Sequence, residues 1–307
     1  MNLLLSANNA YLSPLKIMLT SFCETNRGEH HHIYFLYGNV DVDLLTSISS
    51  YFENHYDVTF IAKKINESDF KQFPVSHHFS IETYYRFLVT DIIPPEENRV
   101  LWLDIDIIVK KSLYEFYYQD FEGKMVAVCK SINKNPETLL KRLGCPVGTV
   151  YFNAGVILFN LELIRRNYKV GDFFSYFASH KENITWLDQD ILNGVFALQT
   201  KNHDYRRYNY QMFSDDCLQK AELEYIENNT AIIHYIGAKK PWHSGYHNPC
   251  KKYWRKYASL YEKKKNPVAY YCLLPIRPAL QLKRVPHLVM RTIRAIRRKR
   301  SGMTSAT

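Results

Sequence analysis

The chain has 307 residues, of which 46% are hydrophobic and 15% aromatic, so it is long enough and apolar enough to bury a full globular core. Its net charge of +10 comes from the C-terminal region: residues 251–307 hold 16 Lys and Arg against one acid, whereas residues 1–250 hold 24 basic and 29 acidic side chains. A mildly acidic body argues against a basic groove, so we expect no nucleic acid as a partner.

Short apolar runs with helical patterns between them indicate an α/β domain. The runs that predict strands are residues 3–5, 33–37, 58–61, 100–103, 125–128, 156–159 and 231–235. Helices are predicted at residues 12–25, 41–55, 80–91 and 184–198. Strands this apolar are typical of a mostly parallel sheet that is buried on both faces. Ligands bind at the carboxyl ends of the strands in such sheets, so polar residues just after a strand are the first candidates for a site.

Composition changes near residue 262, where the segment 262–267 has the charge and the proline of a solvated linker. We therefore predict a catalytic domain at residues 1–262 and a basic, helical, membrane-associating tail at residues 263–307. In the tail, apolar side chains recur at one helical spacing and arginines at another: Val289, Ile293 and Ile296 against Arg291, Arg294 and Arg298. A basic amphipathic helix suits an anionic membrane surface, although a disordered tail or a helix packed on the domain fits the same pattern.

The sharpest local signal is the pair Asp104 and Asp106 at the end of an apolar strand. Side chains two apart on a strand share a face, so both carboxylates can converge on one cation. Two carboxylates leaving a hydrophobic strand are costly without a positive partner, which favours a divalent metal. The plainer alternative is a strand end that runs into solvent.

Three later segments carry polar side chains beside predicted elements. Asn153 and Gly155 precede the apolar run at 156–159, where a simple turn is the alternative to a ligand contact. The run 188–193 places several polar side chains at a helix start, where an N-cap explains only one of them. Residues 234–240 follow a strand with an imidazole, a glycine and a lysine.

Together these blocks resemble family 8 glycosyltransferases, the group of bacterial lipopolysaccharide galactosyl- and glucosyltransferases and of glycogenin. The similarity runs in order from Leu3 to about Trp242 and is closest to the lipooligosaccharide α-galactosyltransferase branch. It implies the GT-A fold, a Rossmann-like nucleotide-diphospho-sugar transferase domain. It also implies retaining transfer of a hexose, galactose or glucose, from a UDP-sugar to a saccharide acceptor such as lipopolysaccharide or another cell-surface glycan.

The resemblance gives each matching residue an expected role. Asp104, Asp106 and His234 correspond to the metal ligands, and this donor set favours Mn²⁺ over Mg²⁺, which rarely takes nitrogen. Gly237 and Lys240 correspond to residues that hold the diphosphate. The residues expected along the donor sugar are Arg86, Asn153, Ala154, Gly155 and Asp188, with Gln189 beneath the anomeric carbon.

The nucleotide end departs from the family pattern. The residues expected to bind this part of the donor are Ala7, Asn8, Tyr11 and Ile105. Asn8 can accept a hydrogen bond from the uracil imide and Tyr11 can stack on the base, but Ala10 cannot replace the amide that the family commonly has there.

Two routes to retention are open. In a front-face displacement the departing diphosphate accepts the proton of the acceptor hydroxyl, and Gln189 only steadies positive charge. In a double displacement Asp188 or Asp190 is the nucleophile. An amide is a poor nucleophile and the family offers no well-placed carboxylate, so the front-face route is favoured. His77, His78 and Tyr151 are candidates for the acceptor pocket, with ordinary surface and core residues as the alternative.

Other enzyme classes fit less well. A haloacid-dehalogenase-like phosphohydrolase also has an apolar strand that ends in DxD, but there the motif follows the first strand. No GxGxxG or GxxxxGK[ST] is present for a dinucleotide oxidoreductase or a P-loop NTPase. A non-catalytic sugar-nucleotide-binding protein remains as an alternative, which the intact set of metal ligands argues against.

The cysteines and the N-terminus bear on the compartment. Six cysteines lie scattered without CxxC spacing, which indicates reduced thiols, and the N-terminus lacks the cationic segment of a signal peptide. We expect a cytoplasmic enzyme, peripheral on the inner face of a bacterial cell membrane, where a lipid-linked acceptor would lie.

Overall fold

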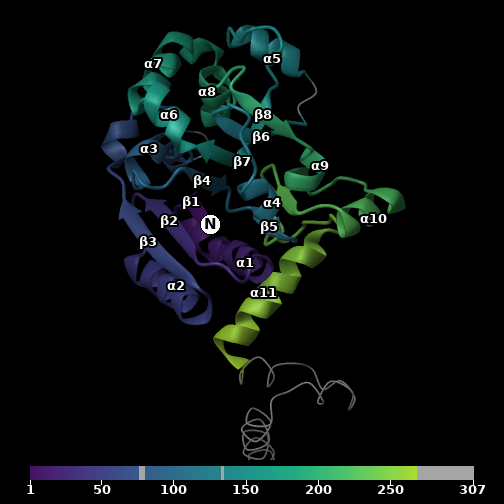
Figure 1. The fold of residues 1–307 in the computed structure, drawn as a ribbon. Helices are drawn as coiled ribbons and strands as arrows, with labels where there is room; N and C mark the ends of the chain where they lie inside the picture. Colours follow the sequence, from purple (N-terminus) through teal and green to yellow (C-terminus); the bar gives the residue numbers. More distant parts are fainter. Residues whose placement is uncertain (76–79, 133–134, 268–307) are drawn as a thin grey trace, which may run out of the picture. The chain divides into compact units, whose positions relative to one another are not determined.

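A seven-stranded sheet forms the centre of the fold, in the order β3-β2-β1-β4-β7-β6-β8 (Figure 1). The computed structural model describes residues 1–75, 80–132 and 135–267. The chain divides into two units, Met1–Trp254 and the part from Arg255 onward. The strands of the large sheet are β1 Asn2–Ser6, β2 His31–Tyr37, β3 Val58–Lys64, β4 Arg99–Leu103, β6 Val126–Lys130, β7 Phe152–Asn160 and β8 Thr200–His203.

The sheet is mixed, because β7 runs against both of its neighbours. The pairs β1·β2, β1·β4, β2·β3 and β6·β8 are parallel, whereas β7 pairs antiparallel with β4 and with β6. The mostly parallel sheet is therefore confirmed, with one reversal that the sequence did not predict. Since β7 is antiparallel to β4, the start of β7 lies beside the carboxyl end of β4. Leu103 pairs with Val156, and the Asp104 N–H donates to the Gly155 carbonyl at 2.9 Å.

Buried side chains from the strands and the surrounding helices form the core. Leu3, Leu101 and Leu158 lie on adjacent strands and have no exposed surface. An aromatic cluster covers one face, with Phe87 stacked on Phe173 at 4.7 Å between ring centroids. Strands that are buried in this way have continuous apolar sequences, which is why the apolar runs predicted them.

The predicted helices at residues 12–25 and 41–55 are α1 Asn9–Thr25 and α2 Val42–His55, capped by Asn8 and Asp41. The helix expected at 184–198 is the shorter α8 Leu187–Val195. The remaining α-helices are α4 Tyr114–Tyr117, α5 Pro136–Arg142, α6 Leu161–Asn167, α7 Val170–His180, α9 Tyr205–Tyr208 and α10 Lys220–Asn228, and the short 3₁₀ helices are η1 Glu67–Phe70 and η3 Lys181–Asn183.

The helix predicted at residues 80–91 is present as two consecutive helices of different type. The segment forms the 3₁₀ helix η2 Ile81–Leu88 followed by a single turn, α3 Val89–Ile92. Within η2 the Arg86 side chain donates from Nε to the Thr83 carbonyl, three residues earlier, at 2.9 Å. Such an i, i+3 arrangement suits the 3₁₀ repeat.

The run at residues 231–235 was expected in the main sheet and instead forms part of a second, three-stranded sheet in the order β5-β10-β9. Its strands are β5 Ile107–Val109, β9 Tyr210–Met212 and β10 Ile232–Tyr235. The antiparallel pairing of β10 with β5 sets His234 opposite Ile107, next to Asp106. The chain leaves the large sheet at Leu103 and enters the small one at Ile107, so both aspartates lie at the junction.

Helix α11, Lys251–Lys265, continues across the boundary predicted at residue 262. The Asn266 N–H donates to the Glu262 carbonyl at 3.0 Å, so the segment begins as helix rather than as a linker. The amphipathic pattern at 289–298 lies outside the described residues, and the division at 262 remains a prediction. In the part of the chain that the structure describes, every helix is too short or too polar to cross a membrane.

Candidate metal and donor site

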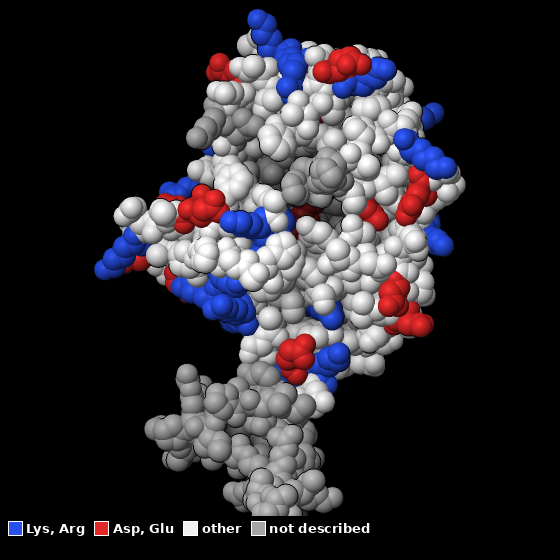
Figure 2. Space-filling model, turned by 180° about the vertical axis from the view of Figure 1, so that it is seen from behind, with Lys and Arg blue, Asp and Glu red and all other residues white. Residues whose placement is uncertain are grey.

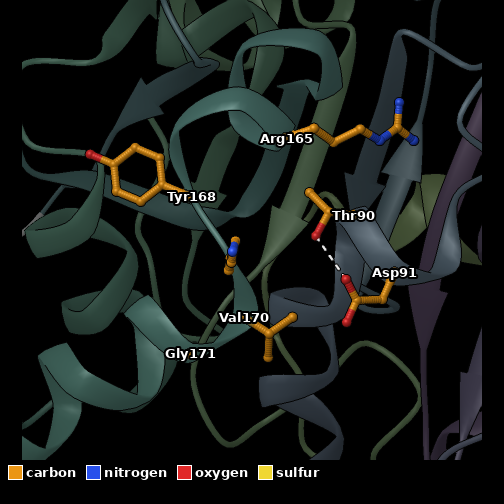
Figure 3. A pocket seen from close by; sticks show the side chains of 7 residues that line it. Thr90, Asp91, Arg165, Tyr168, Val170 and Gly171 are labelled. Atoms are coloured by element: carbon orange, nitrogen blue, oxygen red, sulfur yellow. Dashed lines mark hydrogen bonds between the residues drawn. The ribbon is translucent and has the colours of Figure 1, made fainter.

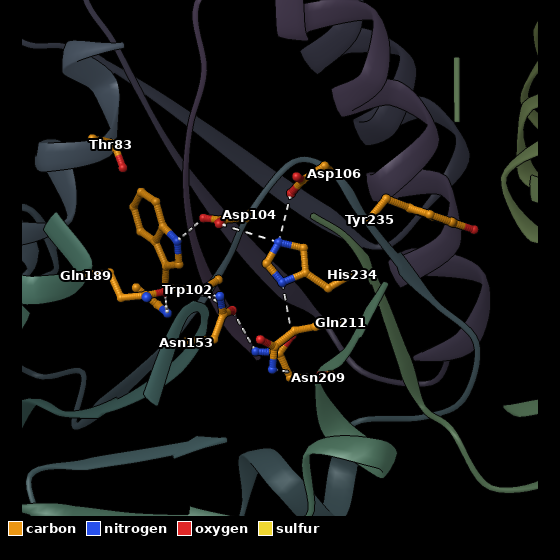
Figure 4. Close-up of polar contacts among 12 residues, drawn as sticks. Thr83, Trp102, Asp104, Asp106, Asn153, Gln189, Asn209, Gln211, His234 and Tyr235 are labelled. Atoms are coloured by element: carbon orange, nitrogen blue, oxygen red, sulfur yellow. Dashed lines mark hydrogen bonds and ion pairs between the residues drawn. The ribbon is translucent and has the colours of Figure 1, made fainter. Parts of the chain in front are cut away.

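Three side chains converge where the two sheets meet, two from strand ends and one from within a strand. Asp104 follows β4, Asp106 precedes β5 and His234 lies in β10 (Figure 4). One ligand atom from each lies within 4.8 Å of the others, and within the described ranges no other group of three His, Cys, Asp or Glu does so. His234 Nε2 is 3.2 Å from Asp106 Oδ1 and 3.8 Å from Asp104 Oδ2. The structure thus brings together the metal-ligating residues expected from the sequence.

Asp104 is oriented by two donors. The Trp102 indole N–H donates to Asp104 Oδ1 at 2.8 Å, and Arg86 Nη2 donates to the same oxygen at 3.0 Å. The Arg86 guanidinium lies 4.1 Å from the centre of the Trp102 ring, so one cation–π contact holds both donors in place. With Oδ1 occupied, Oδ2 is the oxygen that faces His234.

Asp106 is buried between Lys240 and His234. Lys240 Nζ lies 2.5 Å from Asp106 Oδ2 and also donates to the Tyr235 carbonyl at 2.8 Å. Burial alone would raise the pKa of Asp106, but Lys240 and His234 beside it hold that pKa well below its usual range. The carboxylate is therefore ionised across the whole neutral pH range.

Gly155 leaves the space that the cluster occupies. A Cβ at this position would lie 2.2 Å from His234 Cε1 and 2.9 Å from Asp104 Oδ2. Real Cβ contacts are longer, so only a glycine fits between the histidine and the aspartate. The glycine in the Asn-Ala-Gly block is thus required by close approach, not by a turn.

The Arg86 side chain also reaches the opposite wall of the site. Its Nη1 donates to the Ala154 carbonyl at 2.5 Å, and its Nε lies 3.2 Å from Asp188 Oδ2. Thr83 donates its hydroxyl to Asp188 Oδ1 at 2.7 Å. Burial raises the pKa of Asp188 to about 6, while Arg86 and the Thr83 hydroxyl act in the other direction. Both oxygens of Asp188 therefore have protein partners.

Gln189 and Asn153 are joined by a hydrogen bond between their side-chain amides. Gln189 Oε1 accepts from Asn153 Nδ2 and from the Ala154 N–H, both at 3.1 Å (Figure 4). Gln189 Nε2 donates to the Tyr151 hydroxyl at 3.0 Å. Tyr151 is buried, which agrees with the alternative of an ordinary core residue; its place in an acceptor pocket stays a prediction. His77 and His78 lie outside the described residues.

Asp190 has no exposed surface. It accepts from the Tyr151 hydroxyl at 2.5 Å through Oδ1. Its other oxygen accepts from the backbone N–H groups of Thr185 and Trp186, at 2.7 and 2.9 Å. Four donors including Arg142, at 3.5 Å, thus surround this carboxylate.

Asn209 is a site residue that the sequence reading missed. Its Oδ1 lies 3.0 Å from His234 Nδ1, and its Nδ2 donates to Asn153 Oδ1 at 2.9 Å. Asn209 has no exposed surface and precedes a three-residue strand, β9. No spacing or motif marks an asparagine before so short a strand, so the sequence held no signal for it.

Of the residues expected at the nucleotide, Ala7, Asn8 and Tyr11 lie at the start of α1, and Ile105 lies between β4 and β5. Asn8 uses its Oδ1 to accept from the Ala10 N–H at 3.0 Å, as the N-cap of α1. This leaves the amide N–H₂ of Asn8, a donor, free of that bond. Tyr11 packs edge-on against Trp242 at 5.7 Å between ring centroids, and burial raises the pKa of the Tyr11 hydroxyl above its ordinary value. Ala7 and Ile105 are buried, and Gly237 has a φ of +81°, which favours glycine.

Figure 2 shows acidic side chains inside a hollow on the face opposite to the view of Figure 1. A separate hollow of about 410 Å³ lies between α3, α6 and α7 (Figure 3). None of the predicted site residues lines it. Its arginine, Arg165, donates to the carbonyls of Ile93, Pro94, Pro95 and Glu97, so this cation is used in holding a turn.

Comparison with known proteins shows the family of this chain. The profile of Glycosyl transferase family 8 matches residues 2–245, and the chain belongs to this family. The membership excludes the phosphohydrolase alternative and confirms the resemblance.

Individual relatives are distant. The chain is 30% identical over 211 residues to a lipopolysaccharide 1,3-galactosyltransferase of Salmonella typhimurium, which covers 66% of this chain and 60% of that protein. It is 27% identical over 251 residues to a lipopolysaccharide 1,2-glucosyltransferase of Escherichia coli, with 79% and 70% covered. A crystal structure of the galactosyltransferase LgtC in complex with donor and acceptor sugar analogs superposes with a TM-score of 0.72, at 24% identity, over 84% of this chain and 96% of that one. The GT-A fold is thereby confirmed.

Proposed function

We propose that this protein is a metal-dependent, retaining hexosyltransferase that moves galactose or glucose from a UDP-sugar to a saccharide acceptor. The observation that carries the proposal is the convergence of Asp104, Asp106 and His234. The names of the relatives, which transfer galactose or glucose to lipopolysaccharide, support a hexose donor and a cell-surface glycan as acceptor.

The three side chains suit a divalent cation of intermediate hardness. Two carboxylates and one imidazole are the ligands that Mn²⁺ accepts, whereas Mg²⁺ prefers oxygen alone. The space that Gly155 leaves between His234 and Asp104 supports the assignment, since a larger residue would fill it. When bound, the metal would supply positive charge to the departing diphosphate.

The residues of the chain would complete the charge balance. Lys240, beside Asp106, is placed to interact with a diphosphate that shares the metal, and the left-handed Gly237 lets the backbone before it approach closely. Arg86 links Asp104 to Asp188 and so connects the metal ligands with the expected sugar side. A preorganised set of donors of this kind stabilises leaving-group charge without reorganisation during the reaction.

For the route of retention we propose a front-face displacement. The acceptor hydroxyl forms its bond to the anomeric carbon as the bond to the diphosphate breaks, and the hydroxyl proton passes to a diphosphate oxygen. The burial of Asp190 behind Tyr151 and the two partners of Asp188 support this route, because a nucleophile needs a free carboxylate oxygen at the sugar. Gln189 would then lie beneath the anomeric carbon as a polar amide.

The decisive experiment is a screen of UDP-sugars for hydrolysis in the presence of Mn²⁺, followed by NMR of the linkage formed on a saccharide acceptor. We expect Asp104→Asn and Asp106→Asn to abolish metal-stimulated turnover while the fold is retained by circular dichroism. Near-normal, metal-stimulated turnover in both variants would contradict the proposed site. Turnover of phosphomonoesters in place of UDP-sugars would contradict the proposed reaction.

We further propose that the basic tail, residues 263–307, rests on an anionic membrane surface on the cytoplasmic side. The proposal is supported by the excess of basic residues after residue 250. It brings the catalytic domain to a lipid-linked acceptor.

A further inference from the structure

Five side-chain hydrogen bonds form an unbroken chain from the imidazole of His234 to the carboxylate of Asp190. The members, in order, are His234, Asn209, Asn153, Gln189, Tyr151 and Asp190. Each link is between 2.5 and 3.1 Å long. This hydrogen-bond chain begins at a ligand of the proposed metal and passes through Asn153 and Gln189, which are expected at the donor sugar.

The backbone fixes the direction of this chain. A backbone N–H can only donate, and two of them reach the central amides: Ala154 N–H donates to Gln189 Oε1 at 3.1 Å, and Gly155 N–H donates to Asn153 Oδ1 at 3.0 Å. Neither amide can therefore be turned over without setting two donors against each other. The oxygen and nitrogen positions of Asn153 and Gln189 follow from the main chain alone.

The orientation of Asn209 follows from that of Asn153. Because Asn153 Oδ1 is an acceptor, the Asn209 atom beside it must be the donor Nδ2. The carbonyl oxygen of Asn209 then faces His234 Nδ1 at 3.0 Å, and a carbonyl oxygen can only accept. His234 must consequently carry a proton on Nδ1, which leaves Nε2 as the nitrogen that faces Asp106 and Asp104.

The hydrogen bonds at the Asp190 end of the hydrogen-bond chain agree with this direction. Gln189 Nε2 donates to the Tyr151 oxygen, so the Tyr151 proton must go elsewhere, and it is donated to Asp190 Oδ1. Asp190 is surrounded by donors and is the terminal acceptor. Every donor in the chain thus points away from His234 and toward Asp190, an arrangement in which each bond polarises the next.

We propose that Asn209 is a positioning residue that fixes the tautomer and the ring orientation of the metal-ligating His234, and that it ties the metal ligand to the Gln189 amide through Asn153. The inference rests on the proposed function, since it concerns the same metal site. An outer partner of this kind holds the ligand nitrogen toward the metal, and its removal typically lowers metal affinity about 10- to 100-fold.

The first experiment determines the tautomer of His234 directly, without an activity assay. Full-length protein labelled with ¹⁵N-histidine is observed by ¹H–¹⁵N NMR without added metal and with Zn²⁺, a diamagnetic cation that imidazole binds. The His234 signals are assigned with His234→Gln. We expect a protected Nδ1–H signal in the wild type, and on addition of Zn²⁺ a change at Nε2 but not at Nδ1.

Two variants of Asn209 separate positioning from packing. Asn209→Asp keeps an acceptor for Nδ1–H and loses the donor to Asn153, so the Nδ1–H signal should remain and the Mn²⁺ affinity should stay within a few-fold of wild type. Asn209→Leu removes the acceptor, so that signal should be lost to exchange and the affinity should fall about 10- to 100-fold. Asn26→Leu is the matched control, because Asn26 is also a buried asparagine and its amide bonds to the Phe22 carbonyl and the Leu113 N–H, outside the site.

The inference is overturned if the wild type shows no Nδ1–H at His234, or if Asn209→Leu leaves that signal and the metal affinity unchanged. Equal losses in Asn209→Leu, Asn209→Asp and Asn26→Leu would also overturn it, because packing alone would then explain the effect. Failure of the proposed function appears elsewhere, as Mn²⁺ binding that survives Asp104→Asn and Asp106→Asn, so the two failures are distinguishable.

Discussion

The replacement Gly155→Ala tests the packing of the site with a single methyl group. The added Cβ would lie 2.2 Å from His234 Cε1 and 2.9 Å from Asp104 Oδ2. Non-bonded carbon atoms prefer roughly 3.5–4.0 Å, so the methyl group and the imidazole overlap by more than about 1 Å. His234 cannot yield freely, because Asn209 holds its Nδ1 at 3.0 Å and its strand, β10, is paired on both sides.

We expect the overlap to be relieved by displacing His234 or Asp104. Overpacking of a rigid interior costs about 1–3 kcal/mol of unfolding free energy, and the displaced ligand should lower the affinity for Mn²⁺ by at least about tenfold. Chemical denaturation and Mn²⁺ titration of UDP-sugar hydrolysis measure the two effects. Gly171→Ala in α7 is the matched control, since its Cβ meets nothing within 4 Å. A Gly155→Ala protein with wild-type stability and wild-type metal affinity would refute the close approach.

Three further predictions concern the surroundings of the site. Burial raises the pKa of Asp188 from 3.8 to about 6, so between these values the native state binds more protons than the unfolded state, and the unfolding free energy should fall as pH rises from about 4 to about 6. Asp188→Asn should flatten this dependence in a series of denaturation curves at different pH, and an unchanged slope would refute the burial effect. Trp102→Phe removes the indole donor to Asp104 and should weaken Mn²⁺ binding about tenfold, as measured by isothermal titration calorimetry, with Phe116→Leu as a control at another buried aromatic residue. Equal Mn²⁺ affinity in Trp102→Phe and wild type would show that Arg86 alone orients the Asp104 carboxylate. Truncation after residue 266 removes basic side chains that each contribute about 1 kcal/mol to binding at an anionic surface, so it should release the protein from anionic liposomes while UDP-sugar hydrolysis persists. Equal liposome binding by the truncated and the full-length protein would contradict the membrane proposal.

Residues that follow an apolar strand were the part of the site that the sequence could predict. Asp104 and Asp106 stand at the end of β4, where the strand period alone places them on one face. The roles of Arg86, Asn153 and Gln189 came from the resemblance, because their spacing along the chain carries no geometry. What brings them together is the reversal of β7, which sets its first residues against the carboxyl end of β4.

The small sheet and Asn209 could not be predicted for a different reason. Strands β5 and β9 have three residues each, too few for a periodic pattern to be recognised. Strand β5 also pairs with residues more than a hundred positions away, as Val109 does with Ile232. A buried asparagine beside such a strand acquires its role only from the neighbours that the fold supplies.

The position of the aspartates between two sheets explains how the site combines rigidity with charge. Asp104 is anchored to the large sheet through its backbone bond to Gly155, and Asp106 to the small sheet through the bond from the Tyr235 N–H to its carbonyl, both at 2.9 Å. One oxygen of each carboxylate has protein donors, namely Trp102 and Arg86 at Asp104 and Lys240 at Asp106. The other oxygen of each faces His234 and stays available for a cation. Because the anchors belong to different sheets, a change in how the sheets meet would alter the spacing of all three ligands at once. Substitutions that disturb this junction should therefore weaken metal binding even where they touch no ligand.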